Sequence, residues 1–100
     1  MPGRGMPMFT ENQLAQLDRK YFNVILADGL DVTIQSRNTG HWWYLHCTGC
    51  EGENAVVMFH RHSGNHPYHQ HGRARSLRQA VKSIQGHDAY QMNGRRPVRR

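Results

Sequence analysis

The chain places five of its eight histidines within twelve residues, from His60 to His71. Imidazoles bind transition metals and act as general bases, so three interpretations are open for this stretch. It could be a hydrolytic centre with one histidine as base and another on a metal, a histidine-only metal site, or a polar recognition loop. Magnesium chemistry needs oxygen ligands, and Asp88 is the only acid after Glu53. We therefore expect a recognition loop and no enzymatic activity.

Cys47 and Cys50 are separated by two residues, the spacing at which two thiolates can hold one tetrahedral zinc ion. His60 and His62 alternate along a predicted strand, so their imidazoles share a face and could complete the site, as could His46. The alternative is a pair of thiols without a ligand, with Cys50 exposed in a turn. The sequence favours these unliganded thiols and no resident cofactor, with zinc at Cys47, Cys50, His60 and His62 as the alternative.

Charge is distributed unevenly along the chain, whose net charge is +6 at pH 7. Residues 1–60 hold four basic and six acidic side chains, whereas residues 61–100 hold nine basic side chains and one carboxylate. Such asymmetry favours a polyanionic partner, most often nucleic acid. The alternative is a solvated face that keeps the protein soluble, followed by a basic tail.

Basic residues gather around the expected start of the last helix, where free backbone N–H groups and the helix dipole bind anions. Ser76 can cap this helix and strengthen a phosphate contact. Trp42 shares one face of a predicted strand with Tyr44, while Trp43 takes the other, so an exposed ring could stack on a base. The predicted nucleic-acid contacts are Arg61, Arg73, Arg75, Arg78, Lys82 and Trp42. The alternative is an ordinary solvated helix face.

The apolar pattern predicts one α+β domain over residues 9–92, between a leader at 1–8 and a basic tail at 93–100. A capping box at Thr10 starts the first helix, which we expect to end near Lys20. No stretch approaches the roughly 20 apolar residues of a membrane span. Cytoplasm is the expected location, with reduced cysteines.

Antiparallel strands are expected where branched and aromatic residues run or alternate between turn signals, over residues 22–27, 30–35, 41–47 and 55–62. If the first helix continued to Ala27, three strands would remain instead of four. Residues 63–75 read as a polar loop. A second helix follows the cap at Ser76, packs on one sheet face through a stripe that ends at Ile84, and can end at Gly86.

The order of helix, strands and helix resembles double-stranded-RNA-binding domains. In that family, a glycine-rich stretch followed by lysines opens the last helix and touches phosphate. GRARSLRQAVKSI, residues 72–84, is similar in placement but lacks the lysine pair. The order is also similar to the three-strand-plus-helix arm-binding domains of tyrosine integrases. Both resemblances imply a nucleic-acid partner.

NTGHWWYLH (38–46) and PYHQHGRARSLRQAVKSIQGHD (67–88) resemble small uncharacterised proteins of phages and conjugative elements in gut bacteria. These stretches cover about a third of the chain. The resemblance implies mobile-element biology, a setting that includes inhibitors of host RNA-guided nucleases (anti-CRISPR proteins). A host nuclease, docked on the aromatic strand, is therefore the alternative partner.

Overall fold

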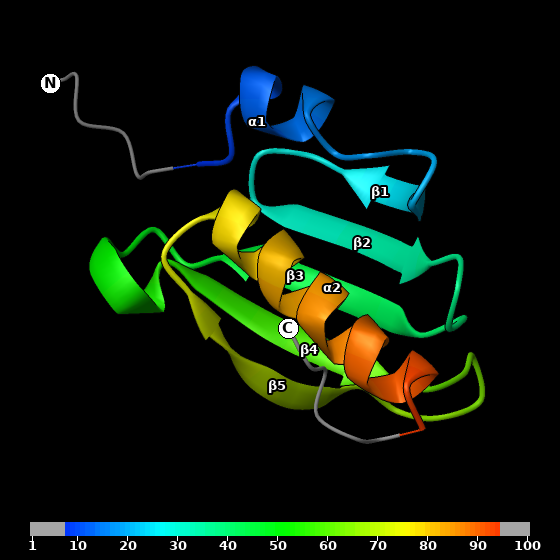
Figure 1. Ribbon diagram of the computed structural model, residues 1–100. Coiled ribbons are helices and arrows are strands. Elements are labelled where there is room, and N and C mark those ends of the chain that lie inside the picture. Colours follow the sequence, from blue (N-terminus) through cyan, green and yellow to red (C-terminus); the bar gives the residue numbers. More distant parts are fainter. Residues whose placement is uncertain (1–7, 95–100) are drawn as a thin grey trace, which may run out of the picture.

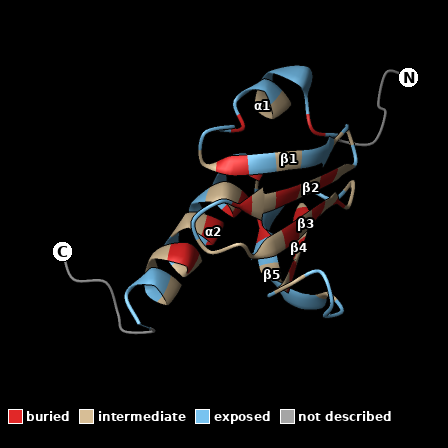
Figure 2. Cartoon of the chain, turned by 90° about the vertical axis from the view of Figure 1, so that its right-hand side faces the viewer, coloured by how far each residue is buried: buried red, intermediate tan, exposed pale blue. Residues whose placement is uncertain are grey.

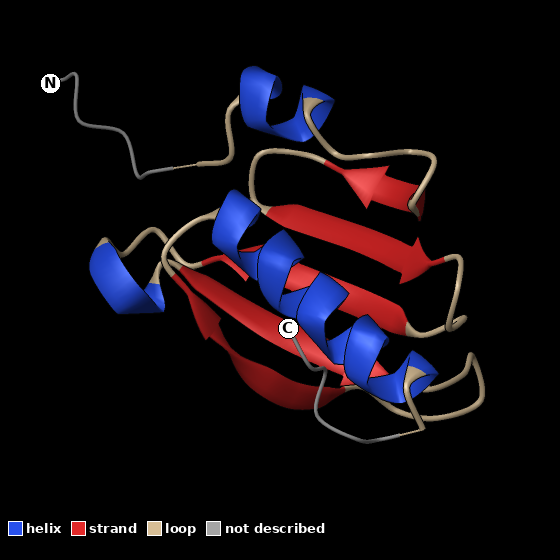
Figure 3. Cartoon of the chain, in the orientation of Figure 1, coloured by secondary structure: helices blue, strands red, loops and turns tan. Residues whose placement is uncertain are grey.

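The computed structural model describes residues 8–94 and confirms the predicted α+β architecture (Figure 3). In chain order the elements are α1 (Glu11–Ala15), β1 (Phe22–Ala27), β2 (Asp31–Ser36), β3 (Trp42–Cys47), the 3-10 turn η1 (Gly52–Asn54), β4 (Val56–Arg61), β5 (His69–Ala74) and α2 (Leu77–Met92). The strands form one antiparallel sheet in sequential order (Figure 1). α2 crosses one face of this sheet, and α1 lies beside the β1 edge (Figure 1).

The sheet has five strands, whereas the sequence predicted three or four. The additional strand, β5, lies inside the stretch predicted to be a polar loop, and it pairs with β4 as an edge strand. The first three residues of β5 are exposed, and Ala74 at its end is the one buried residue of this strand. An edge strand that is solvated on both faces has no hydrophobic alternation, which is why the sequence pattern missed it.

The predicted capping box at the first helix is present. The Thr10 hydroxyl accepts a hydrogen bond from Gln13 N at 3.1 Å, and Gln13 Oε1 accepts one from Thr10 N at 2.8 Å. α1 nevertheless ends at Ala15, short of the expected Lys20. The Asp18 carboxylate accepts hydrogen bonds from the backbone N–H groups of Lys20 and Tyr21, and so stabilises a turn there in place of further helix.

The second helix starts at the predicted cap, where the Ser76 hydroxyl accepts a hydrogen bond from Gln79 N at 3.1 Å. It does not end at Gly86 but continues to Met92. Asp88 is fully buried one half-turn beyond Gly86, so tertiary contacts outweigh the weak helix propensity of one glycine. Among the described helices, none has the length and apolar character needed to cross a bilayer.

We call the sheet face that α2 covers the inner face, and the opposite one the outer face (Figure 2). Alternate residues of β2, β3 and β4 point inward and are at most 7% exposed, among them Ile34, Trp43 and Leu45. Trp43 is therefore in the core, while Trp42 and Tyr44 are half-buried on the outer face, as the alternation predicted. α2 closes the core with Leu77, Ala80 and Ile84.

Candidate metal centre

Six histidines gather at one end of the inner face, around His60. This residue is 2% exposed and stacks on Trp43, with ring centroids 4.3 Å apart. Five other imidazole centroids lie 4.8–5.9 Å from its own, those of His41, His62, His69, His71 and His87. We call these six residues the histidine cluster.

Four separate segments supply the histidine cluster. β4 contributes His60, which pairs with Trp43 of β3 on one side and with His69 of β5 on the other. His41 directly precedes β3, and His87 comes from α2, one turn after the buried Ile84. The cluster therefore forms only once the hairpins have paired and α2 has packed across them.

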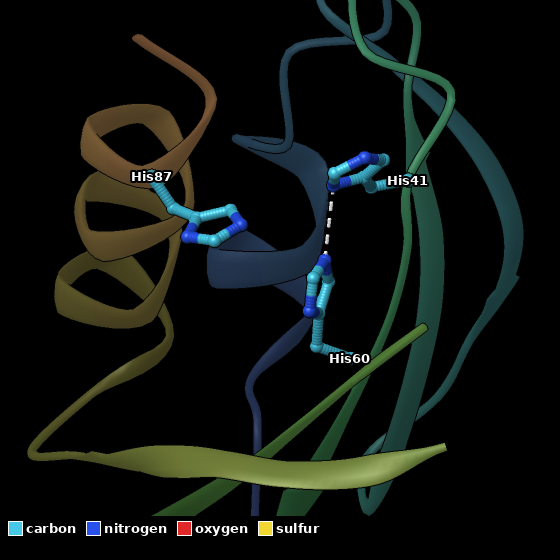
Figure 4. A group of neighbouring side chains, drawn as sticks. All are labelled: His41, His60 and His87. Carbon is cyan, nitrogen blue, oxygen red and sulfur yellow. Dashed lines mark hydrogen bonds between the residues drawn. The ribbon is translucent and has the colours of Figure 1, made fainter. Parts of the chain in front are cut away.

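Within this cluster, His41, His60 and His87 form the tightest group, with one ring nitrogen of each lying within 4.8 Å of the others (Figure 4). His60 Nε2 and His41 Nδ1 lie 3.0 Å apart, a hydrogen bond in which either nitrogen can be the donor. His87 Nε2 is buried and has no hydrogen-bond partner among the described residues. A buried polar atom without a partner costs about 1–3 kcal/mol, which a bound ligand would offset. We call these three residues the histidine triad.

Two members of the triad, His60 and His87, have lowered pKa values that favour the neutral imidazole. Burial, with a further contribution from the neighbouring His87 and His41, lowers the pKa of His60 to about 3. Burial also lowers the pKa of His87, together with His71 and His41, against an opposing effect of Asp88. Neutral imidazole has the free lone pair that a metal ion requires. Protons therefore compete only weakly with a metal ion for the His60 and His87 side chains at neutral pH.

A buried carboxylate fixes the two segments that carry His41 and His87. Asp88 is fully buried; it accepts hydrogen bonds from the Tyr21 hydroxyl at 2.7 Å and from the Thr39 hydroxyl at 3.0 Å. The Thr39 oxygen in turn accepts one from His41 N at 3.2 Å. Asp88 thus links α2, beside His87, to the turn that carries His41. The pKa of Tyr21 is raised to about 12 by burial and by this hydrogen bond, so the phenol stays protonated as a donor.

The predicted metal ligands are split between the two ends of the β3–β4 pair. His60 belongs to the triad, and the ring of His62 lies 4.5 Å from that of His41. Cys47 instead pairs with Val56, four residues or roughly 13 Å along β4 from His60. Cys47 is buried, Cys50 is exposed, and no disulfide joins them. The structure therefore does not bring the thiols and the histidines to a common ion.

Sequence reasoning missed two members of the triad, His41 and His87. Neither belongs to a spaced motif: His41 precedes a strand that was already assigned to the core, and His87 lies beyond the glycine expected to end the helix. Helical spacing from Ile84 was the one usable signal, because a residue three positions on faces the same side. Helical spacing predicts that His87 faces the sheet, but it does not predict that His41 and His60 lie opposite.

The residues predicted to contact nucleic acid lie in separate places. Arg73 and Arg75 border a hollow of about 350 Å³, where the guanidinium of Arg75 forms an exposed ion pair with Glu53 at 3.2 Å. Arg78 and Lys82 line a different hollow of about 410 Å³ between α1 and α2. Four of the six predicted residues thus border two different hollows of the surface.

The other two, Trp42 and Arg61, face each other across β3 and β4 on the outer face. The guanidinium carbon of Arg61 lies 5.0 Å from the ring centroid of Trp42 and 4.4 Å from that of Tyr68. Beside them, the rings of Tyr44 and Phe59 stack with centroids 5.5 Å apart. Among the described residues, the outer face therefore brings Arg61 together with the rings of Trp42, Tyr44, Phe59 and Tyr68. Arg73, which pairs with the outward-pointing Val57, lies on the same face.

Comparisons of the chain with protein-family models, curated proteins and solved structures found no match. The argument for function therefore rests on the geometry of the described residues.

Proposed function

We propose that the chain binds one transition-metal ion, preferentially zinc, through His41, His60 and His87. The observation that carries this proposal is the convergence of three ring nitrogens from three segments, one of them buried without a hydrogen-bond partner. The lowered pKa values of His60 and His87 support it, because protons then compete weakly with the metal.

The donor set determines which metals are suitable. Three imidazoles with no carboxylate in the group suit zinc, copper or nickel, whereas magnesium and calcium require oxygen ligands. Zinc–nitrogen bonds of about 2.0–2.1 Å in a tetrahedron place two ligand nitrogens roughly 3.3 Å apart. The 3.0 Å separation of the His41 and His60 nitrogens is close to this value. His87 would complete the site by moving toward that pair by roughly 1–1.5 Å.

A tetrahedral ion on three histidines keeps one position for a fourth donor. The exposed His62 is placed to supply it, since its ring centroid lies 4.5 Å from that of His41 and 4.8 Å from that of His60. Water is the other candidate. Loss of His62 is therefore expected to weaken zinc binding less than loss of a triad residue.

Zinc titration of the metal-free chain by calorimetry, with metal analysis of the dialysed complex, tests the proposal. We expect one equivalent per chain. His41→Ala and His87→Ala should each weaken affinity by at least about 100-fold, since even the residues that only orient metal ligands typically contribute 10–100-fold. His60 is in the core, so the two less buried positions are the safer variants.

His46→Ala is the matched control. His46 lies on the outer face, where its Nδ1 is 2.9 Å from the Asp31 carboxylate, and it is outside the histidine cluster. We expect this variant to bind zinc like the unaltered chain. If the His46 and triad variants lose affinity equally, or if the unaltered chain binds less than half an equivalent, the triad is not the site.

A further inference from the structure

The outer face carries a second site, centred on Arg61. Its guanidinium lies over Trp42 and Tyr68, and its Nε is buried without a hydrogen-bond partner among the described residues. The ion pairs found among the described residues involve other side chains, Asp31 with His46 and Arg75 with Glu53. Arg61 is thus a cation oriented by two rings and not neutralised by a carboxylate of this part of the chain.

The surroundings of Arg61 favour an anion that also has a flat apolar surface. Trp42, Tyr44, Phe59 and Tyr68 are all half-buried, so part of each ring faces solvent. The carboxylate on this face, Asp31, already accepts hydrogen bonds from Tyr44 and His46. α2 lies on the other side of the sheet, and α1 lies at the β1 edge (Figures 1 and 2).

A hollow of about 370 Å³ adjoins the aromatic rings at Arg61. It is lined by Arg61, His62, His66, Pro67 and His69, which are donors and apolar surface without a carboxylate. The guanidinium of Arg61 therefore borders both the hollow and the aromatic rings. It can contact an anion in the hollow and stack with a planar ring of a ligand.

We propose that the outer face binds single-stranded nucleic acid, with bases stacking on the Trp42, Arg61 and Tyr68 platform and a phosphate in the adjoining hollow. Aromatic and guanidinium planes stack with unpaired bases of any sequence. A duplex buries its bases and offers no such planes to a sheet. The net charge of +6 is complementary to the phosphate backbone. The hollow shares His62 and His69 with the histidine cluster, whereas Trp42, Arg61 and Tyr68 lie outside that cluster, so substitutions on the platform test this site separately from the metal centre.

Fluorescence anisotropy with labelled oligothymidylate and oligouridylate, each beside a duplex of the same length, tests this inference. We expect both single strands to bind more tightly than the duplex. Trp42→Ala and Arg61→Ala should each lower affinity by roughly 5- to 150-fold, the range measured for loss of one base stack. The log–log salt slope should be shallow, at about −0.7 for each phosphate neutralised.

Arg78→Ala combined with Lys82→Ala is the control, because these exposed cations lie on α2, on the other side of the sheet from the platform. We expect that variant to retain affinity within about threefold, after a small loss of general attraction. Circular dichroism checks that every variant is folded, whether or not the chain binds zinc. Tighter binding to the duplex, equal losses in the control, or binding only to an acidic protein would each overturn the inference.

Discussion

The two faces of the sheet are built from alternate residues of the same strands, yet they present different chemistry. Inward-pointing residues of β3 and β4 are buried beneath α2, and three histidines that reach this layer converge on one point. Outward-pointing residues of those strands stay half-exposed and pair aromatic rings with Arg61. Adjacent residues of β3 and β4 point to opposite faces of the sheet. One therefore points toward the buried histidine triad and the next toward the partly exposed aromatic rings of the outer face.

The side chains at the two sites differ in charge. Burial, together with the neighbouring histidines, lowers the pKa of His60 to about 3, so its imidazole is neutral and suited to a cation. A guanidinium stays protonated at any physiological pH, so the outer face keeps its positive charge at Arg61 and is suited to an anion. The comparison shows that side-chain type and solvent exposure together determine which ligand a face can take.

The two faces should differ most in how much their side chains contribute to the free energy of unfolding. Alanine substitutions of the neighbouring Trp43 and Trp42 test this. Trp43→Ala should lower the free energy of unfolding by about 3–5 kcal/mol, since the ring is fully buried and stacks on His60. Trp42→Ala should cost about 1–2 kcal/mol, because its ring is half-buried on the outer face. Urea unfolding of both variants checks this. Equal costs would contradict the assignment of the faces.

Substitution of one carboxylate on each face, Asp88 inside and Asp31 outside, should have a smaller effect on stability and should separate their effects on zinc affinity. Asp88→Asn should cost about 1–3 kcal/mol and weaken zinc binding by about 10–100-fold, because the amide cannot accept from both Tyr21 and Thr39. Asp31→Asn removes a partly exposed acceptor on the outer face and should leave zinc affinity unchanged. Calorimetry and urea unfolding on the two variants measure both effects. If zinc affinity fell equally in both, Asp88 would not be what positions the triad.

Acid should destabilise the metal-free protein through the inner face. His60 titrates near 3 when folded and about 6.5 when unfolded, so the unfolded chain binds more protons between those values. Stability is therefore complete above about pH 6.5 and falls by roughly 1 kcal/mol per pH unit below it, until pH 3. Positive charge on the neighbouring histidines would also repel a protonated His60; these are His41, His62, His69 and His87. Asp88 acts in the opposite direction on His87, whose pKa it raises.

Urea unfolding of the metal-free chain at a series of pH values measures this slope. His60→Gln, which does not titrate, should show a shallower dependence than the unaltered chain. His46→Gln, on the outer face, should leave the slope nearly unchanged. A slope unaffected by the His60 substitution would show that another group is responsible.

The sequence was informative wherever the relevant physics is local. The capping residues Thr10 and Ser76 locate both helix starts, because a hydroxyl that accepts from a backbone N–H three residues on acts within one turn. Alternation correctly placed Trp42 and Trp43 on opposite faces, and the structure shows that Trp43 is the one in the core. The exposed strand β5 and the continuation of α2 through Gly86 were not predicted, since neither has a local apolar signature.

By itself, the sequence determined the α+β class, the alternation of the central strands and the positive charge of the second half. Tertiary structure alone decided that histidines from the segment before β3, from β4 and from α2 meet at one buried point, and that Arg61 lies against the rings of Trp42 and Tyr68. Strand pairing and helix packing bring together residues that are distant along the chain. No short-range pattern of residue types encodes that convergence.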